Sequence, residues 1–147
     1  MTHPKILRLI LGDQLNEHHS WFQKIHDNVT YLLMEIRQET DYVKHHVQKL
    51  ASFFTAMRAF CRRLIELGHR VIYIHLDDPS NAQNFEYNLK QLIRKEKFTR
   101  FEYLLPDEIR LDDELNTITG KLGIPHQVQD TEHFLTQRQD VKEFFVD

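Results

Sequence analysis

Asp13 and Gln14 are the two residues whose position most favours chemistry, because they stand at the end of a predicted strand. Residues 6–11 form an apolar run that is typical of a strand buried on both faces of a parallel sheet. Gly12 then allows the backbone to turn sharply. Open α/β sheets bind ligands at the carboxyl ends of their strands, so this carboxylate and amide could contact a ligand. An Asp in a turn can equally cap the next helix, and the local sequence leaves both interpretations open.

Polar side chains also stand at the end of the second predicted strand, residues 29–36. Glu35, Glu39 and Tyr42 would face the same crevice as Asp13 if the first two strands are neighbours in the sheet. A phenol offers a packing surface, and carboxylates form hydrogen bonds. This set predicts a pocket for a flat ring with a polar edge rather than a catalytic centre.

Asp77 and Asp78 follow the third predicted strand, residues 70–76, and so belong to the same edge of the sheet. Paired carboxylates can perform acid–base chemistry. Ser80 behind them, with Gln83 three residues later, instead predicts a turn and a capping box that begins a helix. We therefore interpret this pair as turn and cap chemistry.

Several kinds of site are disfavoured by what the sequence lacks. The four glycines form neither of the usual phosphate-binding loops, which argues against a dinucleotide or a nucleoside triphosphate held in the usual way. Neighbours such as His45 and His46 point about 100° apart on a helix and would not share one metal ion. The single cysteine, Cys61, excludes an internal disulfide and a cysteine-ligated zinc or iron–sulfur site in this chain. We expect no metal site and no catalytic residue.

The length and composition predict an ordinary globular domain. The chain has 147 residues, of which 41% are hydrophobic and 28% charged, and this suits one domain with a normal core. A net charge of −3 argues against a domain that binds DNA by itself. No signal peptide or membrane-spanning apolar run is visible, so we expect a cytoplasmic protein without a membrane partner.

Strand and helix patterns alternate along the chain. Apolar runs predict strands at residues 6–11, 29–36, 70–76, 101–105 and 124–128. Helical spacing predicts helices at residues 20–25, 42–67, 80–95 and 111–122, with Gly68 and Gly123 ending the second and the fourth. This alternation predicts the α/β class, with right-handed crossovers, a parallel sheet and helices on both faces.

Five motifs, taken in order, resemble one protein family. They are LRLILGDQL at 7–15, YVKHH at 42–46, FFTAMRAF at 53–60, DDPSN at 77–81 and HFLTQRQDVKEF at 133–144. Together they resemble the N-terminal domain of the deoxyribodipyrimidine photolyase-related proteins, which include the bacterial (6-4) photolyases and the iron–sulfur bacterial cryptochromes. The resemblance covers nearly the whole chain, and the ordered run of motifs is its specific part.

The resemblance implies a Rossmann-like, three-layer α/β/α domain over residues 1–147, with five parallel strands in the order 3-2-1-4-5. In this family a larger helical domain follows, which holds FAD and a four-cysteine iron–sulfur cluster and serves DNA photorepair or blue-light sensing. Residues 131–147 would start the connection to that domain, which is absent here. We expect this chain to have the C-terminal catalytic domain as its partner in cis, to meet DNA only through it, and to be non-catalytic alone.

The resemblance also implies a binding site for a light-harvesting antenna, dimethyl-ribityllumazine. The residues carried over by motif are Gly12, Asp13, Gln14, Leu15, Glu39, Tyr42 and Phe53. Asp13 and Gln14 would contact the polar edge of the ring, and Tyr42 and Phe53 would supply apolar or stacking surface. Phe53 is bulkier than the aliphatic residue expected there, so the pocket would be tighter. The implied role is passive, because the bound ring absorbs light and passes the excitation to FAD in the other domain.

Two other functions stay open. The chain ends in a polar stretch that closes with Phe144 and Phe145, which could pack on this domain or on a continuation of the chain. This end, and the absent catalytic domain, would also suit a ligand-free protein-interaction module of α/β fold. A flavodoxin-like nucleotide- or flavin-binding enzyme is a further alternative, although the missing phosphate loop argues against it.

Overall fold

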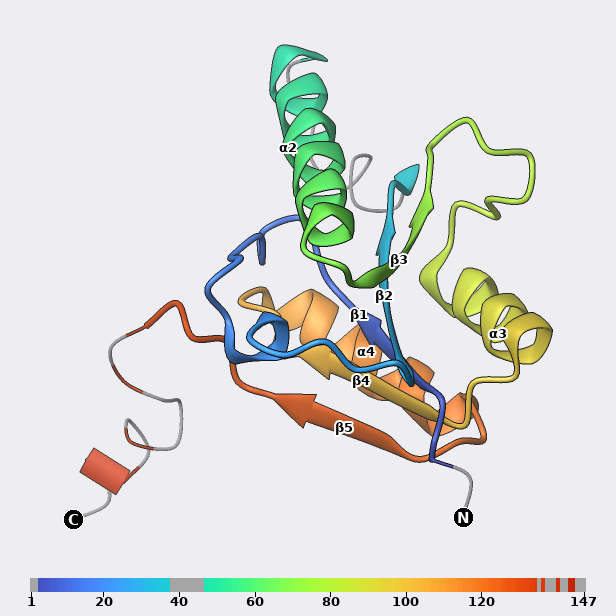
Figure 1. Cartoon of the computed structure of the whole chain (residues 1–147), viewed down its shortest axis with the longest axis vertical. Helices are drawn as coiled ribbons and strands as arrows, with labels where there is room; N and C mark the ends of the chain where they lie inside the picture. Colours follow the sequence, from blue (N-terminus) through green and yellow to red (C-terminus); the bar gives the residue numbers. More distant parts are fainter. Residues whose placement is uncertain (1–2, 38–46, 135, 137–139, 141–142, 145–147) are drawn as a thin grey trace.

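The computed structural model describes residues 3–37, 47–134, 136, 140, 143 and 144 of the chain. Its centre is a sheet of five strands in the order β3-β2-β1-β4-β5, which confirms the predicted order (Figure 1). All strand pairings are parallel. The strands are β1 (Ile6–Leu9), β2 (Val29–Met34), β3 (Arg70–Ile74), β4 (Arg100–Leu104) and β5 (His126–Gln129).

Helices cover both faces of the sheet. They are the 3-10 helix η1 (Ser20–Phe22) and the α-helices α2 (Val47–Glu66), α3 (Phe85–Glu96) and α4 (Ile109–Lys121). One face packs against α3 and α4 through side chains such as Leu89 and Leu115, and the other packs against η1 and α2 through Phe22 and Leu64. The predicted Rossmann-like α/β fold is therefore confirmed. Within the described residues, no helix is long and apolar enough to cross a lipid bilayer.

β2 shows how the sequence builds both cores at once. It is buried along its whole length, as its apolar sequence predicts. Successive side chains of a strand point to opposite faces of the sheet. Leu32 and Met34 accordingly join the core under α3 and α4, whereas Tyr31 and Leu33 join the core under α2. A slip of one residue would exchange the two sets, so this strand has a single favourable register.

Gly68 ends α2, as predicted. The helix reaches Glu66, and Gly68 follows with a φ of +94°. Side chains with a Cβ rarely adopt this left-handed conformation, which makes glycine the usual residue just after a helix. The predicted beginning of this helix, residues 42–46, lies outside the described residues.

The predicted capping box at Ser80 is wrong. The helix begins at Phe85, and Asn84 is its N-cap, with a side-chain oxygen that accepts the N–H of the third helical residue. Ser80 instead donates its backbone N–H and its hydroxyl to the Asp78 carboxylate, at 2.8 and 2.7 Å. Gln83 has a φ of 59°, so the chain turns here rather than winding into a helix. The correction has a simple cause, because Asp78 competes for the same serine and Asn84 is an equally good cap.

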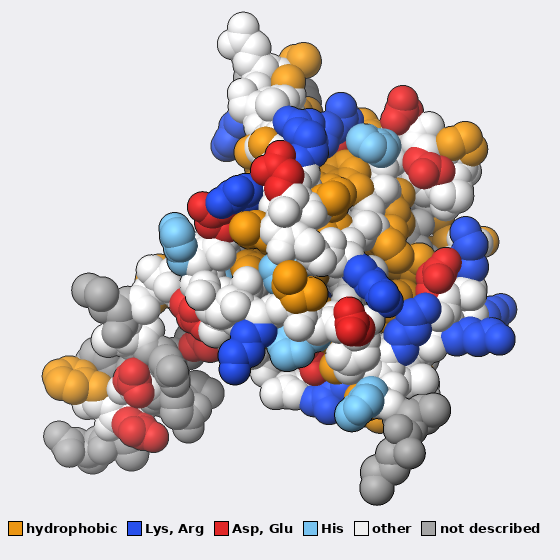
Figure 2. Space-filling model, in the orientation of Figure 1, with side chains coloured by type: hydrophobic (Ala, Val, Ile, Leu, Met, Phe, Trp, Pro, Cys, Tyr) orange, Lys and Arg blue, Asp and Glu red, His pale blue; other side chains and the backbone are white. Residues whose placement is uncertain are grey.

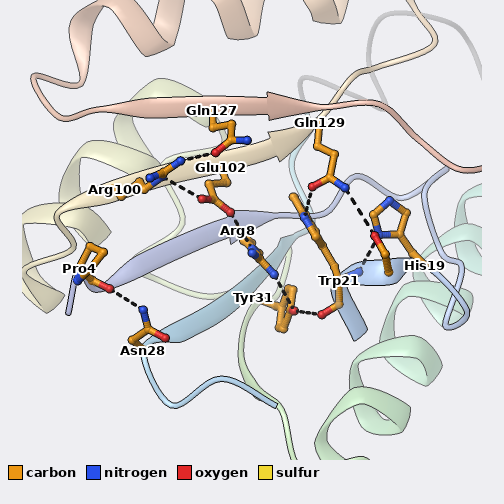
Figure 3. A network of polar contacts seen from close by, with 11 residues as sticks. Pro4, Arg8, His19, Trp21, Asn28, Tyr31, Arg100, Glu102, Gln127 and Gln129 are labelled. Carbon is orange, nitrogen blue, oxygen red and sulfur yellow. Dashed lines mark hydrogen bonds and ion pairs between the residues drawn. The ribbon is translucent and has the colours of Figure 1, made fainter. Parts of the chain in front are cut away.

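A polar network crosses the sheet face beside η1 (Figure 3). The Arg8 guanidinium donates from Nε to Glu102 Oε2 at 2.8 Å and from Nη1 to Tyr31 Oη at 3.2 Å. It also lies 4.7 Å from the centre of the Trp21 ring, within range of a cation–π interaction. Trp21 in turn donates from Nε1 to Gln129 Oε1 of β5 at 2.7 Å. These contacts hold η1 against the sheet and so set the path of the chain between β1 and β2.

The corrected helix start can be tested by removing each candidate cap. We expect Asn84→Ala to lower the free energy of unfolding by about 1 kcal/mol, because an N–H in the first turn of α3 loses its acceptor. Ser80→Ala is the matched control and should cost less than about 0.5 kcal/mol, because its hydroxyl bonds an exposed turn. Urea denaturation of both variants measures the difference, and a larger loss for Ser80→Ala would contradict the structure.

Candidate functional site

The candidate site lies at the carboxyl ends of β1 and β4, where the strand order changes direction. The chain passes from β1 to β2 on one side of the sheet's centre, and later crosses from β3 to β4 on the other side. In open α/β sheets this switch point is the usual place for a ligand. β1 and β2 are neighbours, so the condition under which residues after both strands could share a crevice is met.

Gln14 connects the two strand ends at this edge of the sheet, and the residue is only 2% exposed. Its Oε1 accepts the N–H of Leu11 at 3.0 Å. Its Nε2 donates to the carbonyls of Leu104 and Leu105, at 3.3 and 3.2 Å. The amide therefore closes the turn after β1 and joins it to the end of β4. Contact between Gln14 and a ligand stays a prediction, because backbone groups already engage both ends of its amide.

Asp13, the residue before Gln14, is partly accessible to solvent and stands among other charged groups. Restricted hydration by the surrounding protein raises the pKa of its carboxyl above the ordinary value, although its own backbone N–H has the opposite effect. The like charges of Asp107 and Glu108, in the segment after β4, also raise this pKa, whereas His133 lowers it. Three carboxylates therefore lie near one another at the strand-end site, which makes it acidic.

Gly12 and Phe53 meet at the same place although they are far apart in the sequence. A Cβ built on Gly12 would lie 2.1 Å from Cζ of the Phe53 ring, so only glycine fits beneath this ring. Phe53 and Leu15 both pack, partly buried, on the core under α2. Four of the seven predicted site residues, Gly12, Asp13, Leu15 and Phe53, therefore line one region with Gln14 beneath them. Glu39 and Tyr42 lie outside the described residues.

Glu35, at the end of β2, has a structural role that its sequence position did not show. Its side chain is 0% exposed and receives hydrogen bonds from Arg58 at 2.6 and 2.9 Å. Tyr73 Oη donates to it at 2.6 Å and the N–H of Leu76 at 2.9 Å. Burial alone would raise the pKa of this carboxyl, but these donors outweigh it and hold the pKa below its ordinary value. Glu35 thus anchors α2 to β3 instead of facing a ligand.

The Asp77–Asp78 pair forms a turn, as the sequence predicts. Hydrogen bonds from Ser80 lower the pKa of the Asp78 carboxyl, which fixes it in its charged form. Asn81, just beyond, donates from Nδ2 to the carbonyls of Glu35 and His75, at 2.7 and 2.9 Å. No cluster of three His, Cys, Asp or Glu side chains suited to a metal ion occurs in the part of the chain that the structure describes.

Comparison with known proteins shows the family of this chain. The family model of the deoxyribodipyrimidine photo-lyase-related proteins matches residues 8–147. The chain belongs to this family. It is also 33% identical to a (6-4) photolyase of Agrobacterium fabrum (strain C58 / ATCC 33970) over 137 residues, which is 92% of this chain. The chain spans 27% of the length of that photolyase.

The structure also brings together residues that the sequence analysis did not assign to a site. Asp107 and Glu108 follow the fourth strand, so the strand-end rule that found Asp13 could also have found them. His133 has no such signal, because only the path of the chain after β5 brings it near Asp13. The role of Arg58 could not be predicted either. A helical pattern shows which residues lie on the exposed face of a helix, but not which of them pairs with a buried carboxylate.

The close approach of Gly12 and Phe53 predicts an unusual pair of mutational effects. Gly12→Ala should lower the free energy of unfolding by about 1–3 kcal/mol, because the new methyl group overlaps the ring. In the Phe53→Ala background the same change should cost about 1 kcal/mol less, since the ring is gone. Urea denaturation of the wild type, both single variants and the double variant measures this coupling.

Gly120→Ala is the control, because nothing lies within 4 Å of a Cβ at that helical position. It should stabilise the chain by about 0.5–1 kcal/mol. Additive effects of the Gly12 and Phe53 changes would show that the ring does not lie on Gly12.

The Glu35 anchor predicts a specific dependence on pH. The pKa of Glu35 is lower in the folded chain than its ordinary value of 4.5, so its stabilisation is present above that value and is lost as the pH falls through the folded pKa. Glu35→Gln should lower stability near pH 7 by about 2 kcal/mol and should flatten the loss of stability between about pH 5 and pH 2. Thermal unfolding across this range measures both effects.

Glu66→Gln is the matched control, because this carboxylate at the end of α2 is 67% exposed. It should change neither the stability near neutral pH nor the steepness of the acid limb. An acid limb as steep in Glu35→Gln as in the wild type would contradict the assigned pKa shift.

Proposed function

We propose that this chain binds a lumazine-type antenna chromophore and positions it for energy transfer to FAD in a C-terminal catalytic domain. The observation that carries the proposal is the convergence of Gly12, Asp13 and Phe53 at the switch point of the sheet. The chain belongs to the photolyase-related family, and these are residues to which the motif resemblance would carry over an antenna site. The relative named a (6-4) photolyase supports a light-driven parent protein.

The charge of the site supports a ring without a phosphate. Asp13, Asp107 and Glu108 place carboxylates around the turn, and these would repel a phosphate. A ribityllumazine carries hydroxyl groups and one ring N–H, which can donate to carboxylates. The Phe53 ring adds an apolar surface beside them, against which a flat ring can pack. The same acidity argues against FMN and so against the flavodoxin-like alternative.

The proposed mechanism requires the chain to hold and orient, and no residue has to react. Gly12 lets the Phe53 ring come close to the turn, Gln14 keeps that turn on the end of β4, and Asp13 stays available at the surface. FAD and the iron–sulfur cluster would belong to the catalytic domain. Cys61 is buried, and burial raises the pKa of its thiol, which suits a core residue rather than a metal ligand.

A chromophore titration tests the proposal. The chain is mixed with 6,7-dimethyl-8-ribityllumazine, and binding is followed by the change in lumazine fluorescence. We expect Asp13→Ala to weaken binding about tenfold, the equivalent of one hydrogen bond to a charged group. Asp77→Ala is the matched control, because Asp77 is an exposed carboxylate after a strand of the same sheet, and it should leave binding unchanged. FMN should bind more weakly than the lumazine.

The same titration also measures the effect of the bulky Phe53. Phe53→Ala should weaken lumazine binding by about tenfold or less, because the flat ring loses an aromatic packing surface worth about 0.5–1.5 kcal/mol. A longer protein that joins this chain to the helical domain of the family serves as the second sample. Absence of lumazine binding in both samples, with or without Asp13, would overturn the proposed function.

A further inference from the structure

A second surface lies far from the strand-end site, between the edge strand β3 and α3. It is an open groove of about 670 Å³. Ile72, Ile74 and Leu92 form its apolar floor, and all three remain only partly buried. Figure 2 shows hydrophobic side chains exposed in this region, bordered by Lys and Arg side chains on the side of α3. We name this surface the β3–α3 groove.

The rim of the β3–α3 groove is basic. Lys90, Arg94 and Lys95 line it from α3, and Asp78 is the one carboxylate among its lining residues. Lys90 is partly neutralised by Glu86, 2.6 Å away. Arg94 and Lys95 are exposed and form no ion pair with any residue that the structure describes. A ligand of this groove should therefore combine negative charge with apolar side chains.

The third property of the groove is the open edge of β3. The carbonyl of Ile74 accepts the N–H of Glu35 at 2.9 Å, so the backbone groups of Ile74 point toward β2. In a parallel pair the backbone groups of alternate residues point to opposite sides of a strand. Those of Val71 and Tyr73 are accordingly directed to the outer edge, where no strand pairs with β3 among the described residues. β3 contains no proline to block such pairing.

We propose that the β3–α3 groove binds an extended, acidic peptide segment of a partner protein, which adds to the sheet as a strand beside β3. Main-chain hydrogen bonds to Val71 and Tyr73 would give this segment its register. Successive side chains of a strand point to opposite faces, so every second residue of the segment would face α3. Apolar residues at the central positions of that face would cover Ile72 and Ile74. Carboxylates at the flanking positions of the same face would pair with Arg94 and Lys95 and so favour acidic over basic partners.

The apolar floor favours a peptide over a nucleic acid. Phosphate groups require cations along their whole path, and here cations occupy only the α3 rim while Ile72 and Ile74 form an apolar floor. An extended peptide whose α3-facing positions carry apolar side chains between carboxylates satisfies the rim, the floor and the backbone edge together. The inference does not depend on the proposed chromophore, because the groove and the strand-end turn share no residue.

Hydrogen exchange measured by NMR on the 147-residue chain tests the proposal. The probe is a synthetic peptide of about seven residues, with glutamate, valine, valine and glutamate at the alternate positions that share one face and threonine between them. We expect the amides of Val71 and Tyr73 to exchange freely in the chain alone and about tenfold more slowly with the peptide bound. Slow exchange before the peptide is added would overturn the proposal, because another part of the chain or a second copy would then occupy the edge.

Charge reversal on α3 provides the second measurement. The double variant Arg94→Glu, Lys95→Glu should weaken binding of the peptide about tenfold or more, as measured by fluorescence anisotropy. Lys49→Glu, Arg62→Glu is the matched control, since both residues are exposed on α2, away from the groove, and it should bind like the wild type. The same peptide with lysine in place of each glutamate should not bind. Equal binding by the two double variants, or tighter binding of a single-stranded DNA oligonucleotide than of the peptide, would overturn the proposal.

Discussion

The buried amide of Gln14 is the contact on which the arrangement of the strand ends depends. It bonds the N–H of Leu11 within its own turn and the carbonyls of Leu104 and Leu105 on the neighbouring strand. Buried polar groups are strongly selected to be paired, so this amide allows the turn essentially one conformation. In that conformation Asp13 remains exposed and Gly12 lies against the Phe53 ring of α2. The conformation fixed by Gln14 thus sets the positions of Gly12 and Asp13 at the site.

Two unlike contacts then hold α2 over the sheet. One is the packing of Phe53 on Gly12, which is possible only because glycine has no side chain. The other is the pairing of Arg58 with the buried Glu35. An isolated carboxylate would be costly in this position, but four donated hydrogen bonds satisfy it, and the pair therefore specifies where the helix lies. The packing of Phe53 and the ion pair of Arg58 thus both fix the position of α2 on the sheet.

The predictions from sequence succeed where the signal is periodic and local. The buried runs of β1 and β2 and the helical stripe of α2 appear where expected, because burial on a strand or helix repeats with a fixed spacing. Ser80 shows the limit of this reasoning, since its spacing to Gln83 fits a capping box and yet Asp78 binds it. Several turn residues compete for the same backbone groups, and only the folded chain decides between them.

The sequence by itself determined the α/β class, the strand-end position of Asp13 and, through its ordered motifs, membership of the photolyase-related family. The tertiary structure alone decided that Gln14 faces inward, that Glu35 binds Arg58, and that the edge of β3 lies open beside a basic helix. The physical reason is distance along the chain. Periodicity predicts which face a residue occupies, whereas a side chain's partner depends on the register and packing of segments that are remote in sequence.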